Sequence, residues 1–589
     1  MVRILKNMRP RDWLLVAVST LFIVAQVWLD LKIPDYMSEI TKLVETEGSQ
    51  MADILAAGGK MLLCALASLV SALVVGFFAA RVAADFSMRL RERVYGKVMD
   101  FSMQEINRFS IPSLITRSTN DITQIQMVVA MGMQVIIKAP IMAIMAIEKI
   151  STKSWQWSAL TAGMIVFILV VIIFIMLYAM PKFKKIQWLT DNLNRVTREN
   201  LTGLQVVRAY NAESYQEDKF EKANFELTDN NLKANLAMSV MNPTMNLVMN
   251  GLTLGIYWIG AALINSITVT GMADVVSRLD IFSDMVVFMS YSMQVIMAFM
   301  LLIMIFIMLP RAAVSANRIN EILDTKVHIK DGAVTAPDTG LTGEIEFRDV
   351  SFRYPDAVDD VLHHISFKAR RGETVAFIGA TGSGKSTLVN LVPRFYDATE
   401  GEVLVDGVDV RDYAQDALHD KIGYVPQKSF LFSGTVAENV LYGEEDAPEE
   451  EARRAVAIAQ GADFVEREDV GYGGAVAQAG ANFSGGQKQR LSIARAVAKR
   501  PEIYIFDDSF SALDYKTDRV LRSALKKESA GVTTLIVAQR IGTIRDADRI
   551  IVLEQGHMAG AGTHDELMKS CDVYREIAYS QLSKEELGE

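Results

Sequence analysis

Six apolar stretches occupy much of the first half of the chain, and each approaches the roughly 20 residues that a helix needs to cross a bilayer. They cover residues 13–31, 54–83, 127–147, 158–180, 245–267 and 281–309. The pattern predicts six membrane-spanning helices within a membrane domain of residues 1–325. The N-terminal run is basic, but the apolar stretch after it is long enough to span the lipid bilayer, which argues against a cleavable signal peptide.

Two long polar segments, at residues 89–126 and 182–233, interrupt the apolar pattern. Both are rich in good helix formers, so we expect them to continue the spanning helices. Both also carry many Lys and Arg residues, whereas the loops on the other face, such as residues 265–277, carry few. Because Lys and Arg are enriched on the cytoplasmic side, both segments and both termini are predicted to lie in the cytoplasm. Breaks near Pro112 and at residues 209–213 predict short crosswise segments that rest on a cytoplasmic domain.

A few polar residues lie inside the predicted spans and are candidates for a substrate path. An ionisable group in a membrane is costly unless it faces water or a partner, which singles out Lys138 and Glu148. Glu148 sits beside Lys149 at a span end, so the membrane interface is the stronger reading for it. Three asparagines share one helical face and either line a polar cavity or bond neighbouring helices. They are Asn242, Asn246 and Asn250.

Composition fits a membrane protein and adds little about chemistry. Half of the residues are hydrophobic and the mean hydropathy is positive. The net charge of −10 gives no support to nucleic-acid binding. Two cysteines, Cys64 and Cys571, fit a reduced cytosolic side, and the 30 methionines fit gap-filling between membrane helices.

The pattern changes after residue 325. Residues 326–340 are short and polar with Gly and Pro, as is typical of a linker. From there to residue 589 apolar β-rich runs alternate with helical ones, which predicts an α/β domain over residues 341–589 with a short acidic tail. Strands are expected at residues 374–378, 421–425, 503–506 and 534–538.

A phosphate-binding loop, Gly379-Ala-Thr-Gly-Ser-Gly-Lys385-Ser386-Thr387, follows the first of these strands. Its glycines let backbone amides face phosphate oxygens, Lys385 reaches the terminal phosphates, and a helix from Ser386 points its positive end at the anion. Ser386 and Asp507, at the end of another strand, are predicted to hold Mg²⁺. ATP is therefore the expected ligand. The predicted nucleotide contacts in the loop are Gly379, Thr381, Gly382, Ser383, Gly384, Lys385, Ser386 and Thr387.

A second motif, Phe483-Ser484-Gly485-Gly486-Gln487, decides the class. With it the chain resembles the ABC transporter family over nearly its whole length, with the span count and motif order of exporter half-transporters. The resemblance implies an α-helical six-span membrane domain followed by an α/β P-loop nucleotide-binding domain. It also implies that two such domains meet head to tail. The phosphate loop of one subunit then shares one ATP with the Ser484, Gly485, Gly486 and Gln487 motif of the other.

Three further segments match the family. Tyr354 looks like the aromatic residue that stacks on adenine. Gln427 looks like the glutamine that senses Mg²⁺ and contacts the membrane domain. Ser511-Ala-Leu-Asp514 is similar to the loop that crosses the dimer interface, which adds Asp514 to the nucleotide site.

Three positions depart from the family pattern. Asp508 stands where the family usually carries the catalytic glutamate, and Gln539 stands where it usually carries a histidine. Gln478 replaces a glutamate common before the Ser-Gly-Gly-Gln motif in homodimeric exporters. Losing a well-placed general base typically costs about 10²- to 10⁴-fold in rate. The hypothesis is therefore a degenerate site that binds ATP tightly and turns it over slowly.

Because the Ser-Gly-Gly-Gln motif is intact, we expect it to complete a competent site on a second, non-identical half-transporter subunit. The combination resembles one subunit class of bacterial heterodimeric multidrug exporters, which implies an amphipathic small-molecule, drug or lipid substrate. A homodimer with two weak sites is the first alternative. An ATP-gated channel or regulatory protein on the same scaffold is the second.

Overall fold

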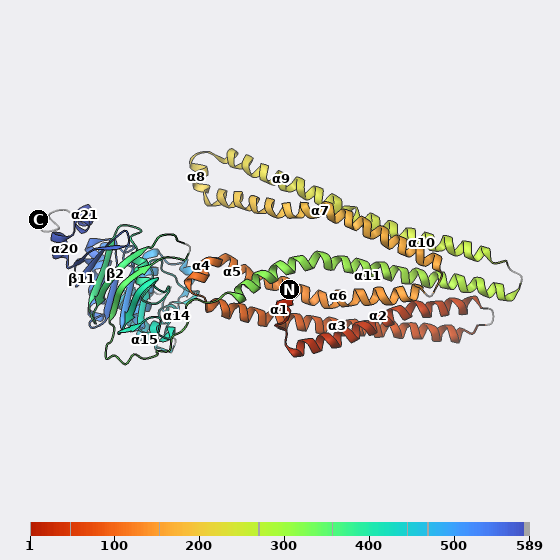
Figure 1. The fold of residues 1–589 in the computed structure, drawn as a ribbon, viewed down its shortest axis with the longest axis horizontal. Coiled ribbons are helices and arrows are strands. Elements are labelled where there is room, and N and C mark those ends of the chain that lie inside the picture. Colours follow the sequence, from red (N-terminus) through yellow and green to blue (C-terminus); the bar gives the residue numbers. More distant parts are fainter. Residues whose placement is uncertain are drawn as a thin grey trace. The chain divides into compact units, whose positions relative to one another are not determined.

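The computed structural model describes residues 2–46, 49–151, 153–268, 271–355, 357–444, 446–467 and 471–581. The chain forms two compact units. One comprises Met1–Lys97 and Pro112–Asp324, and the other comprises Val98–Ile111 and Thr325–Glu589. Figure 1 shows long helices in the first unit and sheets surrounded by short helices in the second.

Helices of 4 to 53 residues make up the first unit. They are α1 (Val2–Leu5), α2 (Pro10–Glu45), α3 (Met51–Met99), α5 (Ile111–Ser118), α6 (Asn120–Ser151), α7 (Trp155–Thr202), α8 (Leu204–Ala209), α9 (Glu213–Ser239), α10 (Met241–Ser266) and α11 (Met272–Asp324). Within the described residues, six helical segments are long and apolar enough to cross a membrane, which confirms the six predicted spans. At about 1.5 Å per residue the 48 residues of α7 extend far beyond a bilayer core of about 30 Å. The polar segments therefore continue the spanning helices, as predicted.

The spans pack through a shared apolar core. Figure 1 shows α11 running along α6, and α7 running along α9 and α10. Trp157 of α7 is buried and its Nε1 donates to the backbone oxygen of Ile256 in α10 at 3.2 Å. A Cβ at Gly260 of α10 would lie 2.5 Å from Met285 Sδ of α11, so a larger residue there would require the Met285 side chain to move. Close backbone approach at small residues is the usual way in which membrane helices associate.

The structure gives Lys138 a partner inside the span. Its Nζ lies 3.5 Å from Asp30 Oδ2 of α2, and Ser68 of α3 also donates to that carboxylate. An ion pair offsets part of the cost of keeping two charges in a membrane. Glu148 is exposed near the end of α6. Asn242, Asn246 and Asn250 lie on an exposed side of α10.

Two larger sheets organise the second unit. In the described part of the chain, one sheet has the order β2-β1-β4-β5 and the other the order β12-β11-β3-β10-β9-β6. The strands are β1 (Ile345–Phe352), β2 (Leu362–Ala369), β3 (Thr374–Gly379), β4 (Glu400–Val405), β5 (Val408–Asp409), β6 (Ile422–Val425), β7 (Gly434–Thr435), β8 (Ala475–Val476), β9 (Ile503–Asp507), β10 (Thr533–Val537), β11 (Arg549–Glu554) and β12 (His557–Gly562). The four expected strands are present as β3, β6, β9 and β10, with ends shifted by at most one residue.

Helices cover these sheets and complete the α/β fold. They are α4 (Met103–Phe109), α12 (Lys385–Asn390), α13 (Gln415–Asp420), α14 (Val436–Val440), α15 (Glu449–Ile458), α16 (Ala462–Val465), α17 (Gly485–Ala498), α18 (Tyr515–Glu528), α19 (Ile541–Ile544), α20 (His564–Ser570) and α21 (Asp572–Gln581). One apolar core joins β1, β2, β3 and α12, and a second joins α15, α17 and β9. The fold class predicted from the sequence is thus the one observed.

The short helix α4 belongs by its contacts to the second unit, although the sequence pattern groups it with the membrane domain. Glu105 of α4 is 2 % exposed and accepts hydrogen bonds from the backbone and hydroxyl of Ser102 and from His328. These hydrogen bonds lower the pKa of the Glu105 carboxyl, although burial acts in the opposite direction. Asn107 of the same helix donates to the Tyr396 hydroxyl at 3.1 Å. Helix α4 is therefore held within the second unit by polar contacts.

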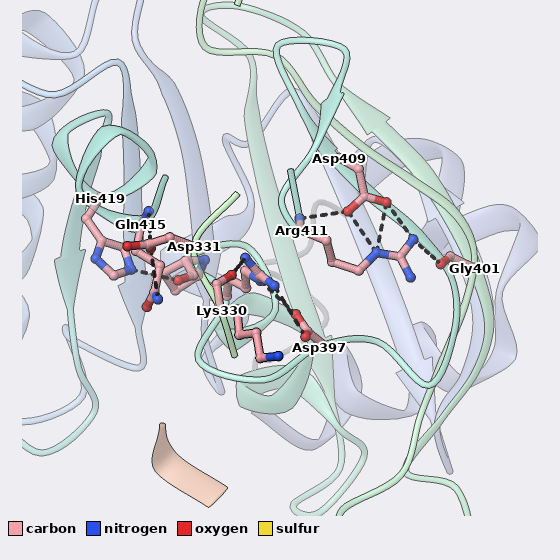
Figure 2. A network of polar contacts seen from close by, with 10 residues as sticks. Lys330, Asp331, Asp397, Gly401, Asp409, Arg411, Gln415 and His419 are labelled. Atoms are coloured by element: carbon pink, nitrogen blue, oxygen red, sulfur yellow. Dashed lines mark hydrogen bonds and ion pairs between the residues drawn. The ribbon is translucent and has the colours of Figure 1, made fainter. Parts of the chain in front are cut away.

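The segment predicted as a linker, residues 326–340, is bonded onto the second unit. Asp331 Oδ1 accepts from the backbone and side chain of Gln415 at 3.1 and 3.2 Å, and Figure 2 shows this contact beside His419. The backbone oxygen of Lys330 accepts from Arg394 at 2.9 Å. Gly332 and Val334 add backbone hydrogen bonds to Tyr413 and Asp412. The segment connects the units in sequence while it is held in place by backbone pairing.

Candidate nucleotide site

The candidate site lies at one edge of the larger sheet. Strands β3, β6, β9 and β10 are parallel neighbours or near neighbours, so their carboxyl ends meet at the same edge. The phosphate loop follows β3, Gln427 follows β6, Asp507 ends β9, and Gln539 follows β10. Ligands of open parallel sheets bind at this edge. Four segments that are far apart in the sequence are therefore brought together by sheet topology.

The phosphate loop has a conformation that depends on glycine. Gly382 and Gly384 have φ angles of +84° and +96°, in the left-handed region that L side chains rarely adopt. A Cβ at Gly384 would also lie 2.7 Å from Leu362 Cδ2. Gly384 is the N-cap residue of α12, so the loop leads directly into the positive end of that helix. This is the backbone arrangement that phosphate oxygens require.

Lys385 is folded over this loop. Its Nζ donates to the backbone oxygens of Gly379 and Ala380 at 2.9 and 2.7 Å. Burial lowers the pKa of Lys385, while the carboxylates of Asp508 and Asp507 act to raise it. The ammonium group thus lies within the loop, close to two acidic side chains, at the place where it can meet a phosphate.

Asp507 and Ser386 face each other at the end of β9. Ser386 Oγ donates to Asp507 Oδ1 at 2.7 Å, and the Asp507 side chain is buried. Burial raises the pKa of the Asp507 carboxyl. A hydroxyl and one carboxylate beside a phosphate loop are hard oxygen ligands, which fits Mg²⁺ held jointly with phosphates. The described residues contain no cluster of three or more His, Cys, Asp or Glu side chains that would hold a metal by themselves.

Two glutamine amides converge on Asp508. Gln539 Nε2 donates to Asp508 Oδ2 at 2.7 Å, and Gln427 Nε2 donates to the same oxygen at 3.2 Å. Asp508 has φ of +47°, a left-handed conformation that Asp tolerates better than longer side chains. Buried Gln489 donates to the Asp508 backbone oxygen at 3.4 Å. The sequence placed these residues at one site, but it did not show that the two amides hold a single carboxylate oxygen.

Tyr354 is connected to the phosphate-loop helix. Its hydroxyl lies 3.0 Å from Thr387 Oγ1, and its ring packs edge-on against Phe352 and Tyr396. The ring is held by neighbouring aromatic residues beside the loop, which is a position from which it can stack on a base.

The Ser-Gly-Gly-Gln motif starts helix α17. Ser484 and Gln487 form a reciprocal cap, with Ser484 N donating to Gln487 Oε1 at 2.8 Å and Gln487 N donating to Ser484 Oγ. A Cβ at Gly486 would lie 3.2 Å from the backbone oxygen of Ala512, so the motif lies close to the loop that ends at Asp514. Asp514 caps α18 by accepting from Thr517 N at 3.0 Å. Among the described residues, no atom lies within 4 Å of a Cβ built at Gly485, so this side of the start of α17 is open.

Comparison with known proteins agrees with this geometry. Residues 16–275 match the family model described as the ABC transporter transmembrane region, and residues 362–511 match the model described as ABC transporter. The chain is 40% identical over 545 residues to an uncharacterised ABC transporter ATP-binding protein of Mycobacterium bovis, covering 91% of this chain and 90% of that protein. It belongs to the ABC transporter family. It is an ATP-driven exporter-type half-transporter, in which one membrane domain is joined to one ABC ATPase domain.

Two more distant relatives extend the comparison. An ATP-dependent lipid A-core flippase of Syntrophus aciditrophicus is 31% identical, covering 88% of this chain and 83% of that protein. The structure of a bacterial Atm1-family ABC exporter with ATP bound has a TM-score of 0.77 at 25% identity, covering 96% of this chain and 98% of that one. A half-transporter of this family requires a dimer partner, and its ABC ATPase domain binds ATP.

Proposed function

We propose that this half-transporter is one subunit of a heterodimeric exporter and that its own phosphate loop carries a degenerate ATP site. The observation that carries the proposal is the Asp508 carboxylate, which accepts hydrogen bonds from both Gln427 and Gln539. Hydrolysis needs a carboxylate that orients the attacking water and a group that stabilises the γ-phosphate in the transition state. Asp508 is one methylene shorter than glutamate and is held by two amides. Gln539 cannot carry a charge or exchange a proton as histidine can.

The nucleotide is held by the remaining residues of the site. Tyr354 stacks on adenine, and Thr381, Ser383 and Lys385 contact phosphates together with the loop glycines. Ser386 and Asp507 hold Mg²⁺, with Gln427 beside them; when bound, the metal neutralises phosphate charge. Lys385 is already oriented by two loop carbonyl oxygens, which supports this assignment. ATP therefore stays bound at this site while Asp508 supports little turnover.

The partner is a second, non-identical half-transporter that carries the glutamate and histidine missing here. Ser484, Gly485, Gly486 and Gln487 face the ATP on the partner's phosphate loop, and Asp514 lies in the loop that crosses between the subunits. The intact cap between Ser484 and Gln487 supports this role, because it leaves the start of α17 ordered and open on one side. The competent site is thus formed by the partner's phosphate loop and this chain's motif.

The substrate class is proposed to be amphipathic, either a lipid or a drug-like small molecule. The spans are apolar, and the relatives include proteins named as lipid A-core flippases. Glu148 and Asn246 are candidate residues of the substrate path, since both are exposed on spanning helices. The proposed location is the cytoplasmic membrane, with both termini and the nucleotide-binding domain in the cytoplasm.

The test is to purify the chain alone and together with any half-transporter encoded by a neighbouring gene, and to measure ATP binding and hydrolysis. We expect the chain alone to bind ATP and hydrolyse it slowly, and the pair to hydrolyse ATP rapidly. Rapid hydrolysis by the chain alone would support the homodimer instead. Uptake of a fluorescent amphipath into inside-out vesicles separates a pump from an ATP-gated channel, because only a pump accumulates substrate against a gradient.

A further inference from the structure

Helix α21 packs against strand β3, which leads into the phosphate loop, and against helix α19. Tyr574 and Ala578 of α21 are fully buried in one apolar cluster with Ile378 of β3, which leads into the phosphate loop. Ile541, the first residue of α19, belongs to the same cluster. The last turn of α21 is therefore fixed beside the loop between β10 and α19, which carries Gln539.

The side chain of Gln581, in that last turn, bonds the loop at two points. Its Nε2 donates to the backbone oxygen of Gln539 at 2.8 Å. Its Oε1 accepts from the backbone N–H of Ile541 at 2.9 Å. The N-cap residue of α19, Arg540, makes no side-chain cap bond, so Gln581 satisfies one amide at the start of that helix. A carboxamide can do both because it carries a donor and an acceptor at a fixed separation.

The loop held in this way bears directly on Asp508. Gln539 Nε2 donates to the Asp508 carboxylate at 2.7 Å. Arg540 donates to the backbone oxygen of Ser511 at 3.3 Å, and Ser511 Oγ donates to the backbone oxygen of Asp508 at 3.0 Å. Gln581 thus holds the backbone carbonyl of Gln539, and the side chain of Gln539 contacts the Asp508 carboxylate.

We propose that Gln581 is a positioning residue of this nucleotide site. Its carboxamide fixes the backbone on both sides of Arg540 and so holds the Gln539 side chain against Asp508. This inference depends on the proposed function in one respect, which is that Asp508 and Gln539 belong to an ATP site. Sequence patterns did not reveal Gln581, because it lies 42 residues beyond Gln539 and outside every recognised motif.

The first test is hydrogen–deuterium exchange on the full-length protein in nanodiscs. Gln581→Ala removes the acceptor of the Ile541 amide, and loss of one hydrogen bond is expected to speed exchange of this amide about ten-fold. Gln581→Glu retains an acceptor, so protection at Ile541 is expected to persist. Ser580→Ala is the matched control, because the hydrogen bond of the Ser580 hydroxyl among the described residues goes to the backbone oxygen of Ile577 in its own helix. Unchanged exchange at Ile541 in Gln581→Ala would overturn the proposal.

The second test measures single-turnover hydrolysis, with protein in excess over radiolabelled ATP, since this detects slow sites. Gln581→Ala is expected to raise the rate about three-fold, because Gln539 no longer holds the Asp508 carboxylate, and to leave the ATP dissociation constant unchanged. In a Gln539→Ala background it is expected to add nothing. An equal change in both backgrounds would refute action through Gln539. Fast turnover by the unmodified chain would refute the degenerate site instead, and the comparison among Gln581 variants would still stand.

Discussion

The combined substitution Asp508→Glu with Gln539→His is predicted to restore hydrolysis at this chain's own phosphate loop. The longer side chain moves the carboxylate outward by about 1.5 Å, the length of one carbon–carbon bond. It also disrupts the hydrogen bonds of 2.7 and 3.2 Å from Gln539 and Gln427 that now hold Asp508. Hydrogen bonds to charged groups contribute about 1.5 to 3 kcal/mol each, so releasing the carboxylate is a substantial change.

The size of the gain follows from the role of a general base. A positioned base contributes about 10²- to 10⁴-fold, so we expect hydrolysis to rise by about 10²-fold or more. Asp508 has φ of +47°, and glutamate tolerates this conformation less well than aspartate. We therefore expect the double variant to lose about 1 kcal/mol of stability while it gains activity.

The assay isolates this site by pairing the chain with the proposed partner subunit, after the catalytic glutamate that we expect in that partner has been replaced by glutamine. Phosphate release then reports only the ATP on this chain's phosphate loop. The single variants Asp508→Glu and Gln539→His separate the two contributions, and bound ATP is measured in each. If ATP still binds and the double variant hydrolyses no faster than the unmodified chain, the reasoning from Asp508 and Gln539 is wrong.

Three further predictions address other contacts. Lys385→Ala removes the ammonium group held over the loop and should weaken binding of a fluorescent ATP analogue about 10- to 100-fold without unfolding the protein. Asn107→Ala removes the hydrogen bond to the Tyr396 hydroxyl and should lower vesicle uptake about two-fold, whereas Lys97→Ala, outside α4, serves as its control and should leave uptake unchanged. Glu451 has a pKa lowered to about 2 by hydrogen bonds from Arg500 and Arg454, so its stabilisation is present above the ordinary value of 4.5 and is lost as the pH falls from there towards 2. The gap in unfolding temperature between Glu451→Gln and the unmodified protein should therefore narrow as the pH falls below about 4.5, and a constant gap would contradict this.

Local sequence patterns were sufficient to predict an element wherever the pattern of a single segment identifies that element. The six apolar stretches predicted six spans, because the bilayer sets a minimum length that each stretch meets alone. The strand before Gly379 and the helix after it were predicted because the phosphate loop contains both its glycines and its flanking pattern. The Ser484 motif was likewise readable, since its capping bonds lie within four residues.

Contacts between distant segments were not readable in this way. Helix α4 was grouped with the membrane domain by sequence, yet Glu105 and Asn107 bond residues of the second unit. Residues 326–340 read as a linker because they are polar and contain Gly and Pro. Their backbone nevertheless pairs with the segment around Tyr413. Neither contact leaves a periodic or compositional signal.

The sequence by itself determined that this is a six-span ABC half-transporter and that Asp508 and Gln539 depart from the family pattern. Only the tertiary structure decided how these two side chains are arranged. Parallel strands bring the ends of β6, β9 and β10 to one edge, so the Gln427 and Gln539 amides both reach a single oxygen of Asp508. The tertiary structure likewise places Gln581 against the loop that contains Gln539. This happens because the apolar face of α21 is buried against strand β3, which leads into the phosphate loop. The residue types determine which chemical groups are available, whereas the packing of the helices and strands determines the distances between those groups.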